Sequence, residues 1–375
     1  MKILFLCGSA EPGKDGVGDY TRRLSGELIR QGHSCAVVAI MDKGVSGALE
    51  ETQQIESTNV PVLRLPYRNG YEKSCIDAKL WVDAFNPEWI SLQYVPFSFH
   101  SKGMPLGLAN AIKQLSKGRN VHIMFHELWL GMDIKASFKF KIWGKVQSVI
   151  IRSFIDTLKP LSIQTQTKLY QKQLLKLGIS VNIMPLFGNI PVLFDFNVMK
   201  GTELLDSKKK FSVIIFGTIH YGAPVEVFTN SVSKYALSSN VDIKIIFIGR
   251  CGEEIKEWVS TCKSKRIKTE VLGELSSVKI SEVLSKADLG ITTTPFLLAE
   301  KSGTVAAMKE HGLPILCVSR AWDVKDFPVD YSPIGIQLFE EHGLAHYITN
   351  KSESQVVNSL SEISNQFLDS LLNFK

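Results

Sequence analysis

Residues 295–317 read PFLLAEKSGTVAAMKEHGLPILC, and this stretch says most about the fold. A short apolar segment before it, Leu289–Thr292, predicts a strand, and Val305–His311 after it predicts a helix of small residues. The turn between them contains Lys301, Ser302, Gly303 and Thr304. Main-chain N–H groups at the start of a helix can bind an anion, and Lys301 adds a full positive charge. The sequence therefore predicts an anion-binding turn.

A second glycine-rich turn, Gly13 to Gly18, follows an apolar segment near the start of the chain. Gly16, Val17 and Gly18 would offer N–H groups to an anion from this side. Two such turns, far apart in the sequence, suggest one phosphate-bearing ligand held between two domains. A tight turn without a ligand is the alternative for the glycines.

The composition is that of a soluble globular protein. The chain has 375 residues, of which 45% are hydrophobic and 21% charged, enough for two domains. No apolar run reaches the roughly 18 residues of a membrane span. The short apolar run at the N-terminus predicts a buried first strand rather than a signal segment. Six scattered cysteines favour a reducing, cytoplasmic compartment with neither disulfides nor zinc.

Strand and helix patterns alternate along the whole chain. Continuous apolar strands such as 243–249 indicate parallel sheets covered on both faces, so we expect two doubly wound Rossmann-like α/β domains. The first domain should span 1–195 and the second 196–350, with the polar segment 200–210 as linker. Residues 351–375 predict one amphipathic helix, Ser352–Leu372, which could pack back on the first domain. The expected strands are Lys2–Cys7, Ser34–Ile40, Glu88–Gln93, Val121–Phe125, Ser162–Thr165, Asn182–Pro185, Phe211–Phe216, Asp242–Ile248, Lys268–Leu272, Leu289–Thr292 and Pro314–Val318.

Positive charge is concentrated in one block. The net charge is +6, yet residues 101–180 alone hold 13 Lys and Arg against 3 Asp and Glu. Within 135–152, lysines alternate with aromatic and aliphatic residues, which suits an anionic membrane surface or a lipid pyrophosphate. An ordinary solvated surface helix explains the same pattern equally well. Nucleic acid is disfavoured because no binding module is recognisable.

Four segments in this order resemble the GT-B glycosyltransferases, and within them the retaining bacterial group known as family 4. They are KDGVGDYTRRLSGELIRQGHSCAVVA (14–39), NPEWISLQYVPFSFHSKGMP (86–105), HIMFHELW (122–129) and ADLGITTTPFLLAEKSGTVAAMKEHGLPIL (287–316). The resemblance spans nearly the whole chain.

The resemblance implies that a nucleotide-diphosphate sugar, UDP- or GDP-linked, binds mainly to the C-terminal domain and the acceptor to the N-terminal domain. It implies retention of configuration and no metal or other cofactor, and no DxD-type motif is found at a strand end. Besides the two turns, the donor-binding candidates are His220, Arg250, Gly273, Glu274 and Glu300.

His126 directly follows an apolar strand and matches the family position near the reacting sugar. With Glu127 and Lys301 it forms the catalytic set, since a strand-end histidine can bond a sugar hydroxyl or act as a general base; a structural histidine is the alternative. The acceptor-binding candidates are Tyr94, Trp129, His100 and Lys102.

The chain departs from the family pattern at two places. Many relatives place an Arg and a Lys after the first C-terminal strand, where this chain has FGTIHYGAP (216–224) and only His220. Relatives also carry a pair of glutamates at the positions that Ala299 and Ala307 occupy here. We therefore weigh an active sugar transferase of surface polysaccharide or glycoconjugate synthesis against a degenerate, non-catalytic protein that binds nucleotide sugar or glycan. A nucleotide-sugar epimerase fits the N-terminal signatures less well.

Overall fold

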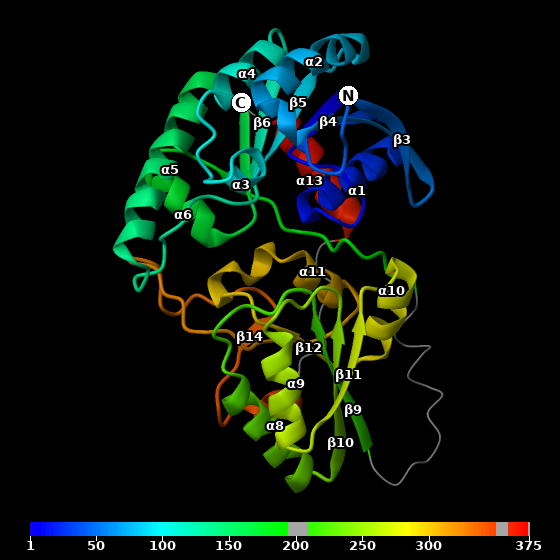
Figure 1. Cartoon of the computed structure of the whole chain (residues 1–375), viewed down its shortest axis with the longest axis vertical. Helices are drawn as coiled ribbons and strands as arrows, with labels where there is room; N and C mark the ends of the chain where they lie inside the picture. Colours follow the sequence, from blue (N-terminus) through cyan, green and yellow to red (C-terminus); the bar gives the residue numbers. More distant parts are fainter. Residues whose placement is uncertain (194–208, 350–358, 374–375) are drawn as a thin grey trace. The chain divides into compact units, whose positions relative to one another are not determined.

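The computed structural model describes residues 1–193, 209–349 and 359–373 and divides the chain into two units (Figure 1). Unit 1 contains Met1–Pro185, Asp323–Phe327 and the C-terminal residues from Leu360. Unit 2 contains Leu186–Trp322 and Pro328–Ser359. The division at 185/186 precedes the expected boundary at 195, and the segment 323–327 joins unit 1 by an antiparallel bridge between Val324 and Asp133.

Unit 1 is built on an eight-stranded sheet in the order β3-β4-β2-β1-β5-β6-β7-β8. All neighbours are parallel except β3 and β4, which form an antiparallel hairpin at one edge. The strands are β1 (Lys2–Cys7), β2 (Ser34–Asp42), β3 (Leu49–Ile55), β4 (Thr58–Pro66), β5 (Trp89–Tyr94), β6 (Asn120–Phe125), β7 (Ser162–Thr165) and β8 (Asn182–Ile183).

Helices cover this sheet. The last helix packs against the first, and its Phe367 ring lies 5.6 Å from that of Phe5 in the central strand. The helices of unit 1 are α1 (Gly16–Arg30), η1 (Tyr67–Asn69), α2 (Gly70–Phe85), α3 (Pro96–Phe99), α4 (Leu108–Leu115), α5 (Phe138–Leu158), α6 (Lys168–Lys176) and α13 (Leu360–Leu372).

Unit 2 has a six-stranded, fully parallel sheet in the order β11-β10-β9-β12-β13-β14. Its strands are β9 (Lys209–Phe216), β10 (Val241–Ile248), β11 (Lys268–Gly273), β12 (Leu289–Thr292), β13 (Ile315–Cys317) and β14 (Ile336–Leu338). Its helices are α8 (Val225–Ser238), α9 (Ile255–Ser264), α10 (Ser277–Lys286), η3 (Phe296–Lys301), α11 (Gly303–Glu310) and α12 (Leu344–Thr349).

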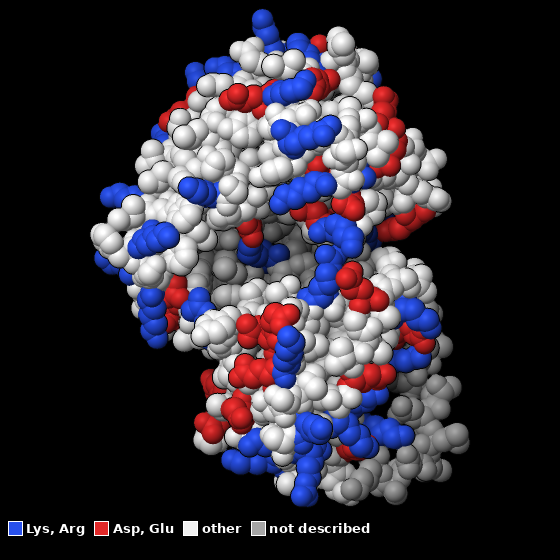
Figure 2. All heavy atoms as spheres, in the orientation of Figure 1, with Lys and Arg blue, Asp and Glu red and all other residues white. Residues whose placement is uncertain are grey.

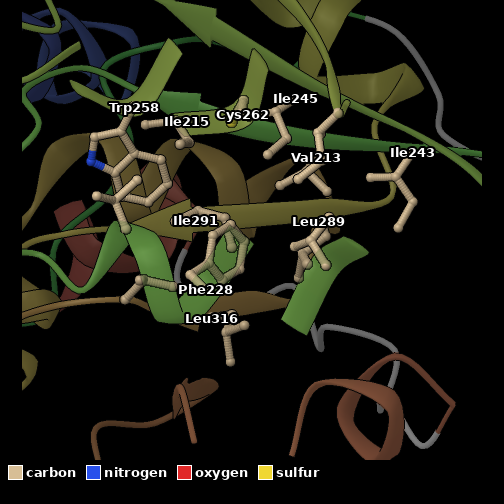
Figure 3. Close-up of a cluster of buried hydrophobic side chains, with 14 of the residues drawn as sticks. Val213, Ile215, Phe228, Ile243, Ile245, Trp258, Cys262, Leu289, Ile291 and Leu316 are labelled. Atoms are coloured by element: carbon tan, nitrogen blue, oxygen red, sulfur yellow. The ribbon is translucent and has the colours of Figure 1, made fainter. Parts of the chain in front are cut away.

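Both faces of the unit 2 sheet are buried, as continuous apolar strands predict. Val213 and Ile215 of β9 point to one face, where Phe228 of α8 and Trp258 of α9 pack on them (Figure 3). Ile214 points to the opposite face and joins a second cluster with residues of α10 and α11. Period-two alternation thus builds two cores on one sheet.

Each sheet reverses its strand order at one place. In unit 1 the chain winds outward from β1 to β2 and later resumes on the other side with β5; in unit 2 the same happens between β9 and β12. Ligands of open parallel sheets bind at such switch points, outside the carboxyl ends of the strands. The glycine turn 13–18 follows β1, and Lys301 lies beyond β12, so both predicted turns follow strands at a switch point.

Several expectations differ from the structure or lie outside it, and strand β14 was not expected. The β3–β4 hairpin was not predicted, because β3 is an edge strand with mostly polar residues. The single helix expected over 352–372 is instead α13, beginning at Leu360; residues 350–358 lie outside the described ranges. Of the linker 200–210, Lys209 and Lys210 belong to β9, and 200–208 also lie outside the described ranges.

Candidate functional site

The turn after β12 is a capped helix start, as its sequence predicts. Ser302 is the N-cap of α11: its Oγ accepts a hydrogen bond from the Val305 N–H at 3.4 Å and lies 3.0 Å from Thr304 Oγ1. The methyl group of Thr304 packs over the loop after β9, because a Cβ on Gly217 of that loop would lie only 2.8 Å from it. Gly217 has φ +81°, which glycine adopts without strain. This close fit brings the turn against the loop after β9.

His220 and Lys301 lie at the switch point of unit 2. The main-chain N–H of His220 donates to Thr293 Oγ1 at 2.8 Å, which ties the loop after β9 to the end of β12. Burial lowers the pKa of the His220 ring, and the positive charge of Lys301 lowers it further. His220 is therefore neutral near neutral pH, while Lys301 carries the charge. The sequence singled out both residues, and the structure brings them together.

A third basic group at this edge was missed. Arg320 follows β13, and its side chain lies against Gly222 in the same loop as His220, where a Cβ on Gly222 would meet Arg320 Cδ at 3.3 Å. Its Nη1 donates to the Ala321 carbonyl at 3.2 Å. The signal was available, since Arg320 is a charged residue just beyond a buried strand of a parallel sheet.

Arg250 and Glu274 form a pair on neighbouring strand ends. Arg250 Nε lies 3.2 Å from Glu274 Oε2, and both side chains are more than half exposed. Gly273 closes β11 with φ +64°, and its carbonyl accepts from the Gly249 N–H at 2.7 Å. The carboxylate thus offsets the charge that Arg250 was expected to bring to a diphosphate.

The two glutamate positions of the family pattern hold buried alanines here, Ala299 and Ala307, and Glu300 lies beside the first of them. Glu300 Oε2 accepts from the Tyr331 hydroxyl at 2.6 Å, so this carboxylate holds the loop after β13. Ala307 is buried against the main chain, since a Cβ on Gly188 would lie 2.6 Å from Ala307 Cα. Glu310, one turn later, accepts from the Gly188 N–H at 2.8 Å. Gly188 thus packs closely against the backbone of α11.

In unit 1, an acidic residue that was not predicted caps the helix after the glycine turn. Asp15 is the N-cap of α1, and its Oδ1 accepts from the Gly18 N–H at 2.6 Å. Burial raises the pKa of Asp15, whereas hydrogen bonds from Gly18 and Val17 lower it. In this structure Asp15 accepts the N–H groups of Val17 and Gly18 that were expected to face a phosphate, so a phosphate there would have to replace the Asp15 carboxylate.

Gly18 also has a packing role. A Cβ there would lie 2.5 Å from the Ser9 carbonyl oxygen, so only glycine lets α1 approach the loop after β1 this closely. A Cβ on Gly16 would meet nothing within 4 Å. Of the two glycines, Gly18, which lies within α1, is thus required by packing, which is a reason different from the tight turn given as the alternative.

A buried ion pair holds this loop in place. Asp42, at the end of β2, bonds both Arg64 Nε at 2.9 Å and Arg64 Nη2, and it also accepts from the Ala10 N–H at 3.0 Å. Burial alone would raise the pKa of Asp42, but the Arg64 guanidinium and these N–H groups lower it overall. The carboxylate therefore stays ionised and anchors the loop that leads to α1.

His126 lies buried at the carboxyl end of β6 with both ring nitrogens hydrogen-bonded. Its Nε2 lies 2.8 Å from Gln93 Oε1, and its Nδ1 lies 3.0 Å from Gln166 Nε2. The Tyr20 ring of α1 meets it edge-on, with centroids 4.9 Å apart. Because amide groups already bond both nitrogens, His126 is oriented as a neutral ring. The geometry opposes the expected general-base role and supports a positioning role.

The same hydrogen-bond chain continues to a second buried histidine. Gln93 Nε2 donates to Ser91 Oγ at 2.8 Å, Ser91 Oγ lies 2.8 Å from His122 Nδ1, and His122 Nε2 lies 2.9 Å from Gln164 Oε1. One assignment satisfies every atom: both histidines are neutral with the proton on Nε2, and all the hydrogen bonds run in one direction. Burial lowers the pKa of His122 to about 4. These hydrogen bonds were not predicted, although polar residues within buried strands were the signal for them.

The other expected residues of unit 1 have mixed positions. Tyr94 lies in the core between the rings of Phe99, Phe125 and Phe154, so its assignment to the acceptor is wrong. His100 Nδ1 accepts from the N–H groups of Lys102 and Met104 and shapes its own loop, while the Lys102 side chain is exposed. Glu127 and Trp129 are partly exposed beyond β6, and Trp129 packs over Gly144 of α5.

No family model matches this chain, and no curated protein matches its sequence. Solved structures do match over nearly its full length. HepE of Anabaena, in complex with UDP and glucose, aligns with a TM-score of 0.60 at 16% identity over 100% of both chains. The catalytic domain of starch synthase IV from Arabidopsis thaliana, bound to ADP and acarbose, gives 0.61 at 10% identity over 100% of this chain and 99% of that one. The lipopolysaccharide outer core galactosyltransferase WaaB gives 0.54 at 11% identity over 99% of each chain.

At these identities the likeness establishes the fold. The expected fold class, two doubly wound α/β domains, is confirmed, and this chain has the GT-B fold seen in these glycosyltransferases.

Proposed function

We propose that this protein is a glycosyltransferase that moves a sugar from a nucleotide-diphosphate donor, UDP- or GDP-linked, to a glycan or lipid-linked acceptor. The reaction would proceed with retention and without a metal ion, in the synthesis of surface polysaccharide or glycoconjugate. The observation that carries the proposal is the meeting of Lys301, His220 and the α11 start at the switch point of unit 2.

This edge of unit 2 suits a diphosphate leaving group. When the bond between sugar and phosphate breaks, negative charge grows on the diphosphate, and preformed donors there lower the barrier. Lys301 and Arg320 would supply charge, and the α11 N-terminus would supply N–H groups. The basic pair that relatives place after their first C-terminal strand would thus be replaced by residues from two other loops. HepE of Anabaena and MnaA of S. aureus, both solved with UDP, have the same fold as this chain.

The acceptor would bind to unit 1, near His126, Glu127 and Trp129. His126 would shape the pocket rather than transfer a proton, since its nitrogens are bonded to Gln93 and Gln166. A lipid-linked acceptor would bring the protein to the inner face of a membrane as a peripheral protein. Within residues 1–193, 209–349 and 359–373, no helix is long and apolar enough to cross a bilayer.

A second candidate function is nucleotide-sugar or glycan binding without turnover, in support of a partner transferase. The lack of a carboxylate at positions 299 and 307, where this chain has two buried alanines, favours it. The hydrogen bond from the Tyr331 hydroxyl to Glu300 also favours this second candidate, because it holds that carboxylate in a structural contact.

The test has two stages. Thermal-shift measurements with UDP, GDP, ADP and TDP identify the base, since a ligand at a hundred times its Kd stabilises the fold by about 2.7 kcal/mol. The matching nucleotide sugars are then screened by mass spectrometry for hydrolysis or transfer.

Lys301→Ala should weaken binding of the nucleotide diphosphate about 10- to 100-fold, the value of a charge-assisted contact. Lys286→Ala, an exposed lysine at the end of α10, is the matched control and should change nothing. Binding without turnover across donors and acceptors selects the second candidate. No stabilisation by any of the nucleotides would refute the transferase and would leave only the glycan-binding form of the second candidate.

A further inference from the structure

Helix α5 exposes an apolar stripe on its outer face. Phe138, Ile142, Val146 and Val149 recur at spacings of four, four and three residues, which places them on one side of a helix. Phe138 is 79% exposed, Ile142 50% and Val149 62%, and Ile134 just before the helix is also exposed. Large apolar side chains in a continuous exposed row mark an interaction surface rather than a solvated one.

The opposite face of α5 already has its partners. Gln147, Ile151, Phe154 and Leu158 are buried along it. Gln147 accepts from the Leu130 N–H at 2.9 Å and donates to the Lys102 carbonyl at 3.1 Å. The exposed stripe is therefore additional to the core-facing one, so α5 is apolar on two sides.

Positive charge without a carboxylate partner borders the stripe, where Lys141 Nζ donates to the Ile134 carbonyl and Lys139 lies over the Trp143 ring. Lys139, Lys141 and Lys145 are exposed on the first half of the helix. Within the described part of the chain, none of these three lysines forms an ion pair with a carboxylate. Asp156 is the only acidic residue of α5, and it pairs with Arg152 at 3.2 Å. Figure 2 shows the side of unit 1 that α5 occupies with blue groups set in uncharged surface.

Helix α2 provides an internal contrast. It also exposes two large apolar residues, Ile76 at 74% and Leu80 at 84%. Its lysines, however, are matched by acids one turn away, with Lys73–Asp77 at 3.1 Å and Lys79–Asp83 at 2.8 Å. The charges on the α2 surface therefore compensate each other, whereas the α5 surface carries uncompensated positive charge.

We propose that the outer face of α5 binds the surface of an anionic lipid bilayer, with the row Phe138, Ile142, Val146 and Val149 entering the boundary of the acyl chains and Lys139, Lys141 and Lys145 contacting lipid phosphates. An apolar stripe flanked by lysines is the pattern of a helix that lies in the plane of a membrane. Charge complementarity selects lipid over a second copy of this chain, because the same lysines would face each other across a symmetric contact. The inference does not depend on the sugar donor or on turnover.

The test is sedimentation of the full chain with vesicles. Phosphatidylcholine vesicles are compared with vesicles that also contain phosphatidylglycerol, each at low and high potassium chloride. Binding should require the anionic lipid and should weaken in high salt. Replacing Lys139, Lys141 and Lys145 with Gln should lower the partition coefficient about 100-fold, roughly a factor of five for each lysine. Phe138→Ser with Ile142→Ser should lower it at least about tenfold.

Matched variants on α2 serve as controls. Ile76→Ser with Leu80→Ser removes equally exposed apolar groups, and Lys73→Gln with Lys79→Gln removes lysines; both should leave vesicle binding unchanged. Equal loss in the α2 and α5 variants would overturn the proposal, as would equal binding to neutral and anionic vesicles. A dimer in sedimentation that Phe138→Ser dissolves, with no vesicle binding by the unaltered chain, would assign the face to a second copy instead. Because nucleotide binding is measured without lipid, failure here is distinguishable from failure of the proposed transferase.

Discussion

His126 Nε2, just after β6, donates a hydrogen bond to Gln93 Oε1 of the neighbouring strand β5 at 2.8 Å. The other end of the same amide donates to Ser91, so a single side chain fixes the orientation of His126 and the proton position on His122. A buried amide in this place acts as a coupling between two rings rather than as an isolated polar residue.

Replacing Gln93 with Ala should destabilise the protein by about 2 to 4 kcal/mol, because it leaves the His126 N–H and the Ser91 hydroxyl without this partner in a buried site. Urea-induced unfolding measures the change. Gln54→Ala removes an exposed glutamine from an edge strand and should cost little. A Gln93 variant as stable as the Gln54 variant would contradict the hydrogen-bond chain.

Acid should destabilise the protein through His122. Burial holds its folded pKa at about 4, below the usual 6.5, so the unfolded state binds the proton more tightly. The contribution is absent above about pH 6.5 and grows as the pH falls towards 4, reaching about 2 kcal/mol of lost stability at about pH 5. Unfolding free energies measured at about pH 7 and about pH 5 check this.

The control for that measurement is His122→Gln, which cannot take up a proton. Whatever its stability at neutral pH, it should lose about 2 kcal/mol less than the unaltered chain on acidification. Equal pH slopes for the two proteins would show that His122 is not the group responsible. The change in slope is therefore the readout, not the absolute stability.

The two glycines at the start of α1 should respond oppositely to alanine. Gly18→Ala forces a Cβ to within 2.5 Å of the Ser9 carbonyl oxygen, and we expect a loss of about 2 kcal/mol or more. Gly16→Ala meets open space at the first position of the helix and should be neutral, or stabilising by up to about 1 kcal/mol. Thermal or urea unfolding of the pair separates packing from ligand binding, and the reverse order of stability would refute this account.

Arg320→Ala should weaken binding of the nucleotide diphosphate about tenfold or more while leaving the fold intact, since the side chain is exposed and lies over Gly222. Calorimetry with the nucleotide found in the thermal-shift panel gives the Kd. Lys263→Ala, exposed on α9, is the control. Unchanged affinity in the Arg320 variant would remove this residue from the donor site.

The buried framework was readable from the sequence. Strands such as β1 and β12 begin and end at the predicted residues, because a parallel strand buried on both faces is a continuous apolar run. The hairpin β3–β4 escaped because its outer strand, LEETQQI, carries mostly polar side chains. Asp15 could have been found, since aspartate directly before a helix is a strong N-cap signal.

The candidate site was only partly readable. Lys301, His220 and Ser302 were identified because they follow apolar strands, and the carboxyl ends of such strands share one edge. Tyr94 was misassigned by the same rule, because strand-end position does not reveal which side of the sheet a ring takes. The partners of His126 come from strands far apart in sequence, and strand order in the sheet is not visible in any local pattern.

Phe367 of α13 lies against both Phe5 and His122, at 5.6 and 5.2 Å between ring centroids. The ribosome makes the segment that carries Phe367 only after every residue of unit 2. During synthesis, the central strand of the unit 1 sheet therefore lacks its contact with α13 until that helix is made. Until then, nascent unit 1 is exposed to chaperones and to aggregation. Completion of the first unit therefore depends on translation of residues that follow the second unit.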